Sequence, residues 1–209
     1  MIELMRAISD VTAAAGKAVL VTMVRVRGST PREVGAWMLI RKDSFAGTIG
    51  GGNLELKAID QARELMADGD AGAQVIDYPL GPALGQCCGG VASLLFEPVT
   101  DALALHFAAL KAEHDAGSHA VSVAGLSPLR ERVLIPEGRN VAALVEAPLR
   151  EAVSQLVNAI EPAPERLETA EGNAYLLQPA WDTRDRLFLF GAGHVGRAIA
   201  AALSPLEFR

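Results

Sequence analysis

Two adjacent cysteines, Cys87 and Cys88, follow Gln86 in the glycine-rich segment LGQCCGG. Thiolates are soft ligands, which suits them to soft metals and to sulfur transfer. Neighbouring cysteines point apart in an extended chain, so a disulfide between them would be strained. No Cys-x-x-Cys pair or nearby histidine supports a tetrahedral zinc site. The segment therefore predicts a loop that handles a soft metal or sulfur; the alternative is a crowded turn that requires small residues.

A second glycine cluster, GTIGGG, precedes a predicted helix that starts at Asn53. Glycines let backbone N–H groups approach a ligand, and a helix start adds unpaired donors and a positive dipole end. This combination favours an anion such as phosphate, whereas a tight turn capped by Asn53 would use the same residues without any ligand. The candidate anion-binding residues are Gly50, Gly51, Gly52, Asn53 and Glu55, together with Arg32 from the preceding loop.

A third cluster, GAGHVG, follows an apolar run and opens a predicted helix, which is the context of a dinucleotide-binding fingerprint. The fingerprint also needs an acidic ribose partner about 20 residues further on, and this chain does not reach it. We therefore expect only the first βα unit of a Rossmann-like domain. The apolar strand at 187–190 would then be covered by another part of the chain or by a second copy, because an unpaired apolar strand promotes aggregation. The candidate nucleotide-binding residues are Gly191, Gly193, His194 and Gly196.

Apolar periodicity and glycine or proline breaks predict strands that alternate with helices along the chain. The predicted helices are 4–15, 53–67, one capped by Thr100, one that begins at Pro148, and 194–203. The predicted strands are 18–26, 36–41, 73–78, 91–96, 119–125, 131–135 and 186–190, and 161–173 is predicted as a surface connection. This alternation predicts an α/β fold with a mixed or largely parallel sheet and flanking helices.

Composition argues against several classes of protein. The 209 residues carry a formal net charge of −6 and an aromatic content of only 5%, which gives no support for nucleic acid or an anionic membrane as partner. No apolar run is long enough for a membrane span or a secretory signal. Two adjacent cysteines do not form a disulfide framework, so we expect a cytoplasmic protein.

The clusters and their surroundings together resemble the XdhC/CoxI family of xanthine dehydrogenase accessory proteins, which are molybdenum cofactor insertion chaperones. The resemblance rests on four blocks in this order: RGSTPREVGAWMLI at 27–40, GTIGGGNLE at 47–55, LGPALGQCCGG at 80–90 and LFGAGHVGRA at 189–198. It implies a cofactor-binding α/β region over residues 1–180 and the start of an incomplete Rossmann-like domain over residues 181–209.

The resemblance also implies a function. The chain would bind molybdenum cofactor (molybdopterin), support its sulfuration by a cysteine desulfurase, and insert it into the molybdenum-binding subunit of a xanthine dehydrogenase. Cys87 or Cys88 would contact the molybdenum of the cofactor, and the GTIGGG turn would hold its phosphate. We expect a homo-oligomer that is a maturation factor and not an enzyme. Two alternatives are an oxidoreductase that binds NAD(P) at GAGHVG and an inert partner-binding domain.

Overall fold

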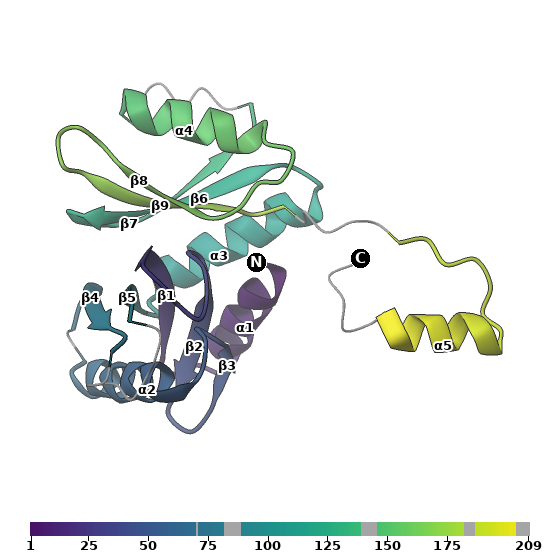
Figure 1. The fold of residues 1–209 in the computed structure, drawn as a ribbon, viewed down its shortest axis with the longest axis horizontal. Helices are drawn as coiled ribbons and strands as arrows, with labels where there is room; N and C mark the ends of the chain where they lie inside the picture. Colours follow the sequence, from purple (N-terminus) through teal and green to yellow (C-terminus); the bar gives the residue numbers. More distant parts are fainter. Residues whose placement is uncertain (70, 82–88, 139–145, 182–186, 204–209) are drawn as a thin grey trace.

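The computed structural model describes residues 1–69, 71–81, 89–138, 146–181 and 187–203 (Figure 1). Its helices are α1 (Ile2–Ala13), α2 (Gly52–Ala67), α3 (Asp101–Asp115), α4 (Ala147–Val157) and α5 (His194–Leu203). Its strands are β1 (Ala18–Arg27), β2 (Trp37–Arg41), β3 (Phe45–Gly47), β4 (Gln74–Pro79), β5 (Val91–Pro98), β6 (Ala120–Ser127), β7 (Leu129–Pro136), β8 (Glu165–Glu168) and β9 (Ala174–Pro179). Thr100 caps α3 as predicted, because its hydroxyl accepts a hydrogen bond from the backbone N–H of Leu103.

The strands form two antiparallel sheets, so the prediction of a largely parallel sheet is wrong. The first sheet has the order β3-β2-β1-β5-β4 and the second has the order β7-β6-β9-β8. All strand pairs between these elements are antiparallel. Helix α2 carries the chain from β3 at one edge of the first sheet to β4 at the opposite edge, and α3 carries it into the second sheet. A parallel pair requires a crossover that returns to a neighbouring strand of the same sheet, and neither of these two connections does so.

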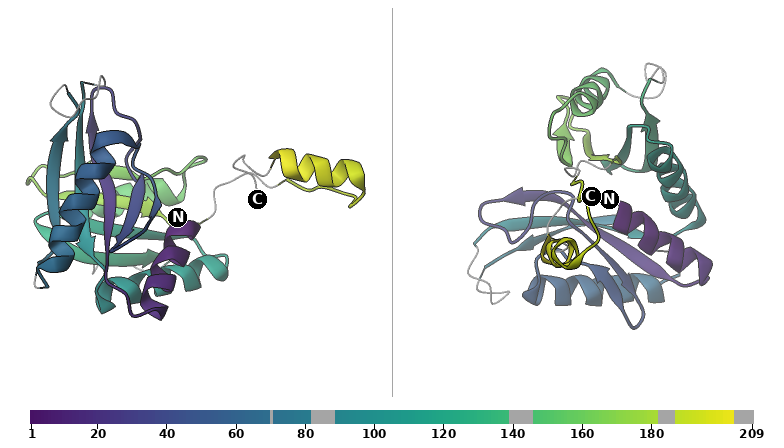
Figure 2. Two further views of the ribbon diagram at one scale, coloured as in Figure 1. Left: turned by 90° about the horizontal axis from the view of Figure 1, so that it is seen from below. Right: turned by 90° about the vertical axis from the view of Figure 1, so that its right-hand side faces the viewer.

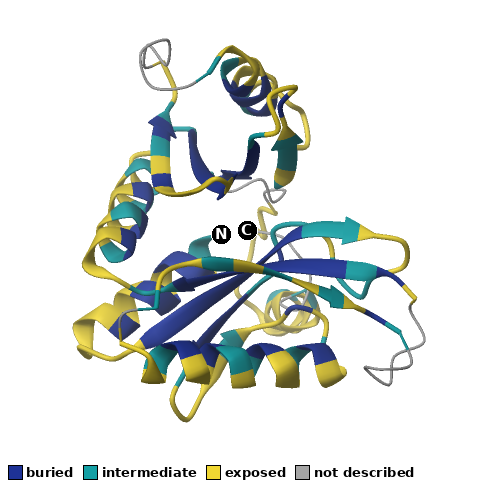
Figure 3. Ribbon diagram, turned by 90° about the vertical axis from the view of Figure 1, so that its left-hand side faces the viewer, coloured by how far each residue is buried: buried dark blue, intermediate teal, exposed yellow. Residues whose placement is uncertain are grey.

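The helices cover both faces of the first sheet. Helix α2 packs on one face through a stripe of small and apolar residues with helical spacing, and its outer side is exposed (Figure 3). Helices α1 and α3 pack on the opposite face. The buried residues of α2 are Leu54, Ala58, Ala62 and Leu65.

The second sheet packs between the first sheet and α4. Val24 of β1 and Leu95 of β5 join Ala124 and Leu176 of the second sheet in one buried cluster. Helix α4 covers the outer face of the second sheet, and Pro148 lies in its first turn as predicted. Strand β8 lies within 161–173 and pairs with β9, so the prediction of a surface connection there is wrong in part.

The C-terminal segment extends away from both sheets (Figure 2). Helix α5 forms where the sequence predicts it, but none of its residues is buried. Residues 187–190 form no strand, so the predicted strand of a Rossmann-like βα unit is wrong over the described residues. Phe188 and Phe190 are 71% and 93% exposed. The described parts of this chain therefore do not bury residues 187–190. Burial of this segment by a second copy of the chain stays a prediction.

Candidate functional site

Two of the predicted motif segments meet where β1 ends. Arg27, the last residue of β1, pairs with Val91 at the start of β5, and the loop that follows passes against Gly90. A Cβ atom on Gly90 would lie 2.3 Å from the carbonyl oxygen of Ser29 and 2.6 Å from that of Arg27. Only glycine allows the two backbones to approach so closely. We call residues 80–90, LGPALGQCCGG, the cysteine segment. Ser29 and Gly89 form an isolated bridge, so the RGSTPREVG loop lies against the end of this segment.

The cysteine segment begins and ends at one pair of backbone hydrogen bonds. The N–H of Leu80 donates to the carbonyl oxygen of Gly90 over 2.7 Å, and the N–H of Gly89 donates to that of Leu80 over 2.6 Å. These bonds continue the pairing of β4 with β5. The role predicted for the residues between them stays a prediction. Three predicted site residues lie outside the described residues: Gln86, Cys87 and Cys88.

The GTIGGG turn packs against the same loop. A Cβ atom on Gly50 would lie 2.4 Å from Cγ of Pro31 and 3.5 Å from Cγ of Arg32. Gly50 also has a φ of 118°, which residues with a side chain rarely adopt. Ile49 anchors the turn in the core beneath α2. One end of the first sheet therefore brings together the RGSTPREVG loop, the GTIGGG turn and the two ends of the cysteine segment.

The carboxylate of Glu55 occupies the backbone donors of this turn. Its Oε1 accepts hydrogen bonds from the N–H groups of Ile49 and Gly51 over 3.0 and 2.9 Å, and from the hydroxyl of Thr48 over 2.5 Å. Burial raises the pKa of Glu55, but the hydrogen bonds from Thr48 and from the backbone of Gly51, Ile49 and Gly50 together lower it below its usual value. The turn therefore binds an anion that the chain itself supplies, and an external phosphate would compete with Glu55 for these donors.

Arg32 lies beside the turn and pairs with its neighbour Glu33. Its Nη2 and Nε donate to Oε1 of Glu33 over 3.0 and 3.2 Å. The hydrogen bond from Arg32 lowers the pKa of Glu33, although slight burial acts in the opposite direction. The two side chains are 40% and 70% exposed, and exposed pairs of this kind contribute only about 0–1 kcal/mol. The guanidinium is therefore partly committed to a carboxylate of the same loop.

The GAGHVG segment does not join this site. Gly191, Gly193, His194 and Gly196 lie at the start of α5, away from β4 and β5 (Figures 1 and 2). Nδ1 of His194 lies 3.1 Å from Nη2 of Arg197 in the same helix. A dinucleotide fingerprint works at the carboxyl edge of a parallel sheet, and the described residues place no strand beside this turn. The alternative of an NAD(P)-dependent oxidoreductase therefore has no support from this geometry.

A buried polar cluster joins the two sheets at the opposite end of β5, and sequence reasoning missed it. Nη2 and Nε of Arg132 donate to the carboxylate of Glu97 over 2.7 and 3.0 Å. Nη1 of Arg132 donates to Gln178 over 2.7 Å and to Ser122 over 3.3 Å. The guanidinium also lies 5.4 Å from the ring centre of Phe107. The members of the cluster come from β5, β6, β7, β9 and α3. The sequence signals were therefore weak: one acidic residue near the end of the apolar strand β5, and one of three consecutive charged residues in β7.

His106 adjoins this cluster and lines a cavity of about 310 Å³ together with Glu97 and Arg132. Its Nε2 lies 2.8 Å from the hydroxyl oxygen of Ser122. Burial, and secondly the charge of Arg132, lower the pKa of His106 to about 4, so the ring is neutral at pH 7. The cavity lies at the other end of the first sheet from the glycine-rich segments. We interpret the cluster as a contact between the sheets.

The soft-metal hypothesis depends on residues outside the described ranges. Within those ranges, no three His, Cys, Asp or Glu side chains are placed to hold a metal ion. The metal-contacting role predicted for Cys87 and Cys88 is therefore neither supported nor contradicted by the structure. A separate finding is that none of the described helices is both long and apolar enough to cross a membrane.

The sequence matches the XdhC and CoxI family over residues 11–79. This range includes the RGSTPREVG loop and the GTIGGG turn and ends just before the cysteine segment. The molybdenum cofactor insertion chaperone PaoD of Escherichia coli (strain K12) is 43% identical over 53 residues, which are 25% of this chain and 17% of PaoD.

The fold resembles that of a solved structure described as a xanthine dehydrogenase from Bacillus halodurans. The TM-score is 0.70 at 23% sequence identity, and the match covers 98% of this chain and 60% of that chain. At this identity the similarity concerns the fold alone. The chain thus spans less than two thirds of the length of PaoD and less than two thirds of the Bacillus halodurans protein. The family match over residues 11–79 includes two of the three segments that form the candidate site.

Proposed function

We propose that this protein binds molybdenum cofactor and delivers it to a molybdenum enzyme of the xanthine dehydrogenase type. Two findings support the proposal. The first is the XdhC and CoxI family match, together with the similarity to a molybdenum cofactor insertion chaperone. The second, which carries the proposal, is the convergence of the RGSTPREVG loop, the GTIGGG turn and the ends of the cysteine segment at one end of the first sheet.

The chemistry of the converging segments suits this cargo. Molybdenum and the dithiolene of the cofactor are soft, so a reachable thiolate from Cys87 or Cys88 is a suitable ligand. The phosphate of the cofactor needs cationic or N–H donors, which the same end of the sheet supplies. We infer that the chain holds and transfers the cofactor without turning over a substrate.

The finer steps of the proposal follow from the family resemblance. The chain would hold the cofactor during its sulfuration by a cysteine desulfurase, and then dock on the molybdenum-binding subunit of the target enzyme. It would act in the cytoplasm as a homo-oligomer. The two-part division at residues 180 and 181 belongs to the same proposal.

Cofactor retention by single cysteine variants tests the proposal. The protein is mixed with isolated molybdenum cofactor and desalted, and its molybdenum content and absorbance spectrum are measured. We expect the parent to retain molybdenum, and either Cys87→Ser or Cys88→Ser to lose it while the thermal unfolding midpoint stays unchanged. The other single variant serves as the matched control. Retention by both single variants at the level of the parent contradicts a thiolate contact, and no retention by the parent contradicts the proposal itself.

Delivery needs a second measurement. The loaded protein is added to the cofactor-free form of a xanthine dehydrogenase, and the recovered activity is compared with that obtained from the same amount of free cofactor. We expect faster recovery from the loaded protein. Equal recovery with and without the protein would reduce its role to storage of the cofactor.

A further inference from the structure

Several of the donors that the sequence predicts for a phosphate are already engaged within this chain. Glu55 accepts hydrogen bonds from the GTIGGG turn, and Glu33 accepts them from Arg32. Two other arginines lie at the same end of the first sheet, Arg25 and Arg27 of β1. Within the described ranges, neither of these two guanidinium groups makes a hydrogen bond or an ion pair. In that part of the chain, neither of them has a hydrogen-bonded partner to release before it binds an anion.

The register of the first sheet shows where Arg25 and Arg27 point. Arg25 lies opposite Ser93 of β5, and Arg27 lies opposite Val91. Alternate residues of β5 face opposite sides, and Leu95 packs against the second sheet whereas its neighbours pack under α2. Residues directly opposite each other share a face of the sheet. Both arginines therefore point to the side of the first sheet that carries the second sheet.

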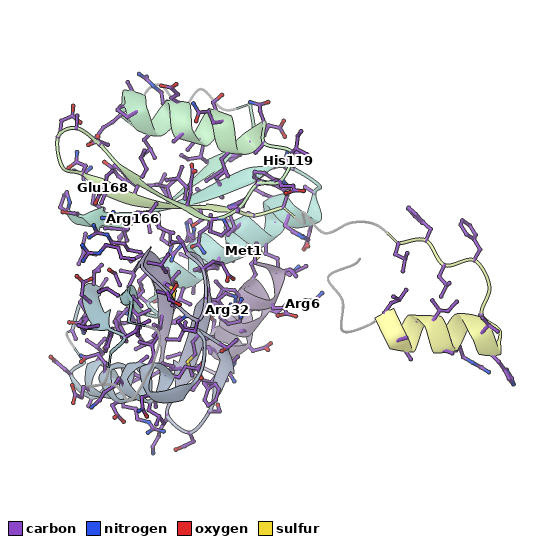
Figure 4. All side chains as sticks on the ribbon, viewed as in Figure 1. Met1, Arg6, Arg32, His119, Arg166 and Glu168 are labelled. Carbon is purple, nitrogen blue, oxygen red and sulfur yellow. The ribbon has the colours of Figure 1, made fainter. Side chains whose placement is uncertain are left out.

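This side also receives β8 of the second sheet. Arg166 and Glu168 of β8 form an ion pair there (Figure 4). The hydrogen bond and charge of Arg166 lower the pKa of Glu168 most, and the charges of Arg25 and Arg27 lower it further, which is consistent with their closeness. In a chain with a net charge of −6, three guanidinium groups thus gather around one exposed carboxylate.

The same arginines adjoin the cysteine segment. The carbonyl oxygen of Arg27 contacts Gly90, and Ser29 bridges to Gly89, the residue that follows Cys88 in the chain. Arg27 is exposed and Arg25 is half-buried, so both are open to a ligand at the surface.

We infer that Arg25 and Arg27 hold the phosphate of the cofactor. This inference rests on the proposed function and specifies where the phosphate of the cofactor binds. It assigns the phosphate to the arginine pair on β1 and not to the GTIGGG turn, whose donors bind Glu55. Paired guanidinium groups suit phosphate because their N–H donors match its oxygens in geometry and charge.

A double-mutant cycle between the arginines and the phosphate tests the inference. Binding is titrated for isolated molybdenum cofactor and for the same cofactor after enzymatic removal of its phosphate. The proteins are the parent, Arg25→Gln/Arg27→Gln, and the single variant Arg27→Gln, whose exposed position keeps the fold intact. The matched control is Arg6→Gln/Arg63→Gln, which makes the same charge change at exposed positions on α1 and α2.

In the parent and in the control, we expect removal of the phosphate to weaken binding about 10- to 100-fold, because it removes the charge-assisted hydrogen bonds from the two guanidinium groups. In Arg25→Gln/Arg27→Gln, binding should be weak with either ligand and should no longer depend on the phosphate. Arg27→Gln alone should show an intermediate dependence.

The opposite outcomes separate this inference from the proposed function. If the parent binds the cofactor but the double variant keeps the full phosphate dependence, the phosphate is held elsewhere and the inference is wrong, while the chaperone proposal stands. If Arg32→Gln abolishes the dependence instead, Arg32 holds the phosphate and the inference is wrong. If the parent binds neither form, the proposed function and this inference fail together.

Discussion

The chain contains two glycine-rich turns that each precede a helix, and the two helices differ in how far they are buried. The GTIGGG turn leads into α2, which buries four residues against the first sheet. The GAGHVG turn leads into α5, which buries none. In the first turn, a Cβ atom on Gly50 would clash with Pro31, whereas in the second a Cβ atom on Gly193 would meet nothing within 4 Å. The pattern of glycines is similar, but only the first turn is held in place by its surroundings.

This difference shows that a glycine motif acquires its chemistry from packing. Backbone donors bind an anion strongly only when other contacts fix their direction, so that little entropy is lost on binding. The first turn meets this condition through Ile49, Pro31 and Glu55. The second turn extends from the body of the protein without a neighbouring strand in the described structure. The two helix starts should therefore respond very differently to matched substitutions.

The largest contrast should come from the helices behind the turns. Leu54 of α2 is fully buried, and Leu54→Ala should lower the free energy of unfolding by about 2–5 kcal/mol. Ile199 of α5 is 39% exposed, and Ile199→Ala should change it by less than about 0.5 kcal/mol. Urea unfolding followed by the fluorescence of Trp37 and Trp181 measures both effects. Equal losses would show that α5 is docked as firmly as α2.

A smaller contrast should come from the glycines themselves. Gly51 has a φ of 78° and a ψ of −173°, a conformation that is nearly restricted to glycine, and the space around it is open. Gly51→Ala should therefore cost about 1–3 kcal/mol through backbone strain alone. Gly193 has no such conformation, so Gly193→Ala should be neutral or slightly stabilising. Thermal unfolding of the two variants measures the contrast; a loss at Gly193 as large as that at Gly51 contradicts it.

The internal anion of the first turn should appear as a dependence of stability on pH. The pKa of Glu55 is lowered in the folded state, so between its folded value and its usual value of 4.5 the unfolded chain binds more protons. Its contribution is complete above pH 4.5 and is lost as the pH falls through the folded pKa. Glu55→Gln should cost about 1 kcal/mol at pH 7, because the amide that replaces the carboxylate would keep one acceptor oxygen without the charge.

The control for this prediction is the pH profile of the variant. Unfolding free energies are measured from pH 7 to pH 3 for the parent and for Glu55→Gln. The difference between the two proteins should shrink as the pH falls below 4.5. A difference that stays constant over this range would show that the carboxylate of Glu55 contributes no charge-dependent stability.

Sequence reasoning predicted most elements of the fold but not how they are connected. Apolar periodicity located α1, α2, β1 and β5, because each of them buries one face or both. It missed β3 and placed β8 in a connection, because both are short edge strands with a weak pattern. It also missed β9, although all six of its residues are buried. The parallel arrangement was wrong because pattern identifies elements and contains little information on which strands pair.

The candidate site was predictable in part for the same reason. The glycine clusters were visible, and the structure brings the GTIGGG turn and the pair Gly89 and Gly90 against the same loop, RGSTPREVG. The occupation of the turn by Glu55 depends on a side chain folding back onto the start of its own helix, which spacing alone does not determine. The interaction of Glu97 with Arg132 spans 35 positions of the sequence, so no local motif indicates it.

The smallest expected effect comes from removing the C-terminal segment altogether. A chain that ends at residue 181 should unfold with the same free energy as the full chain, within about 0.5 kcal/mol, because α5 buries nothing against the described sheets. Trypsin, whose access requires local unfolding or exposure, should cut the full chain before Leu187 and leave a stable core.

Gel filtration of both forms tests whether a second copy covers Phe188 and Phe190, which are exposed in the single chain. If the full chain elutes as a larger species that the shortened chain does not form, and resists trypsin only at high concentration, the segment is an interface between copies, and the second glycine turn is held in place by another molecule.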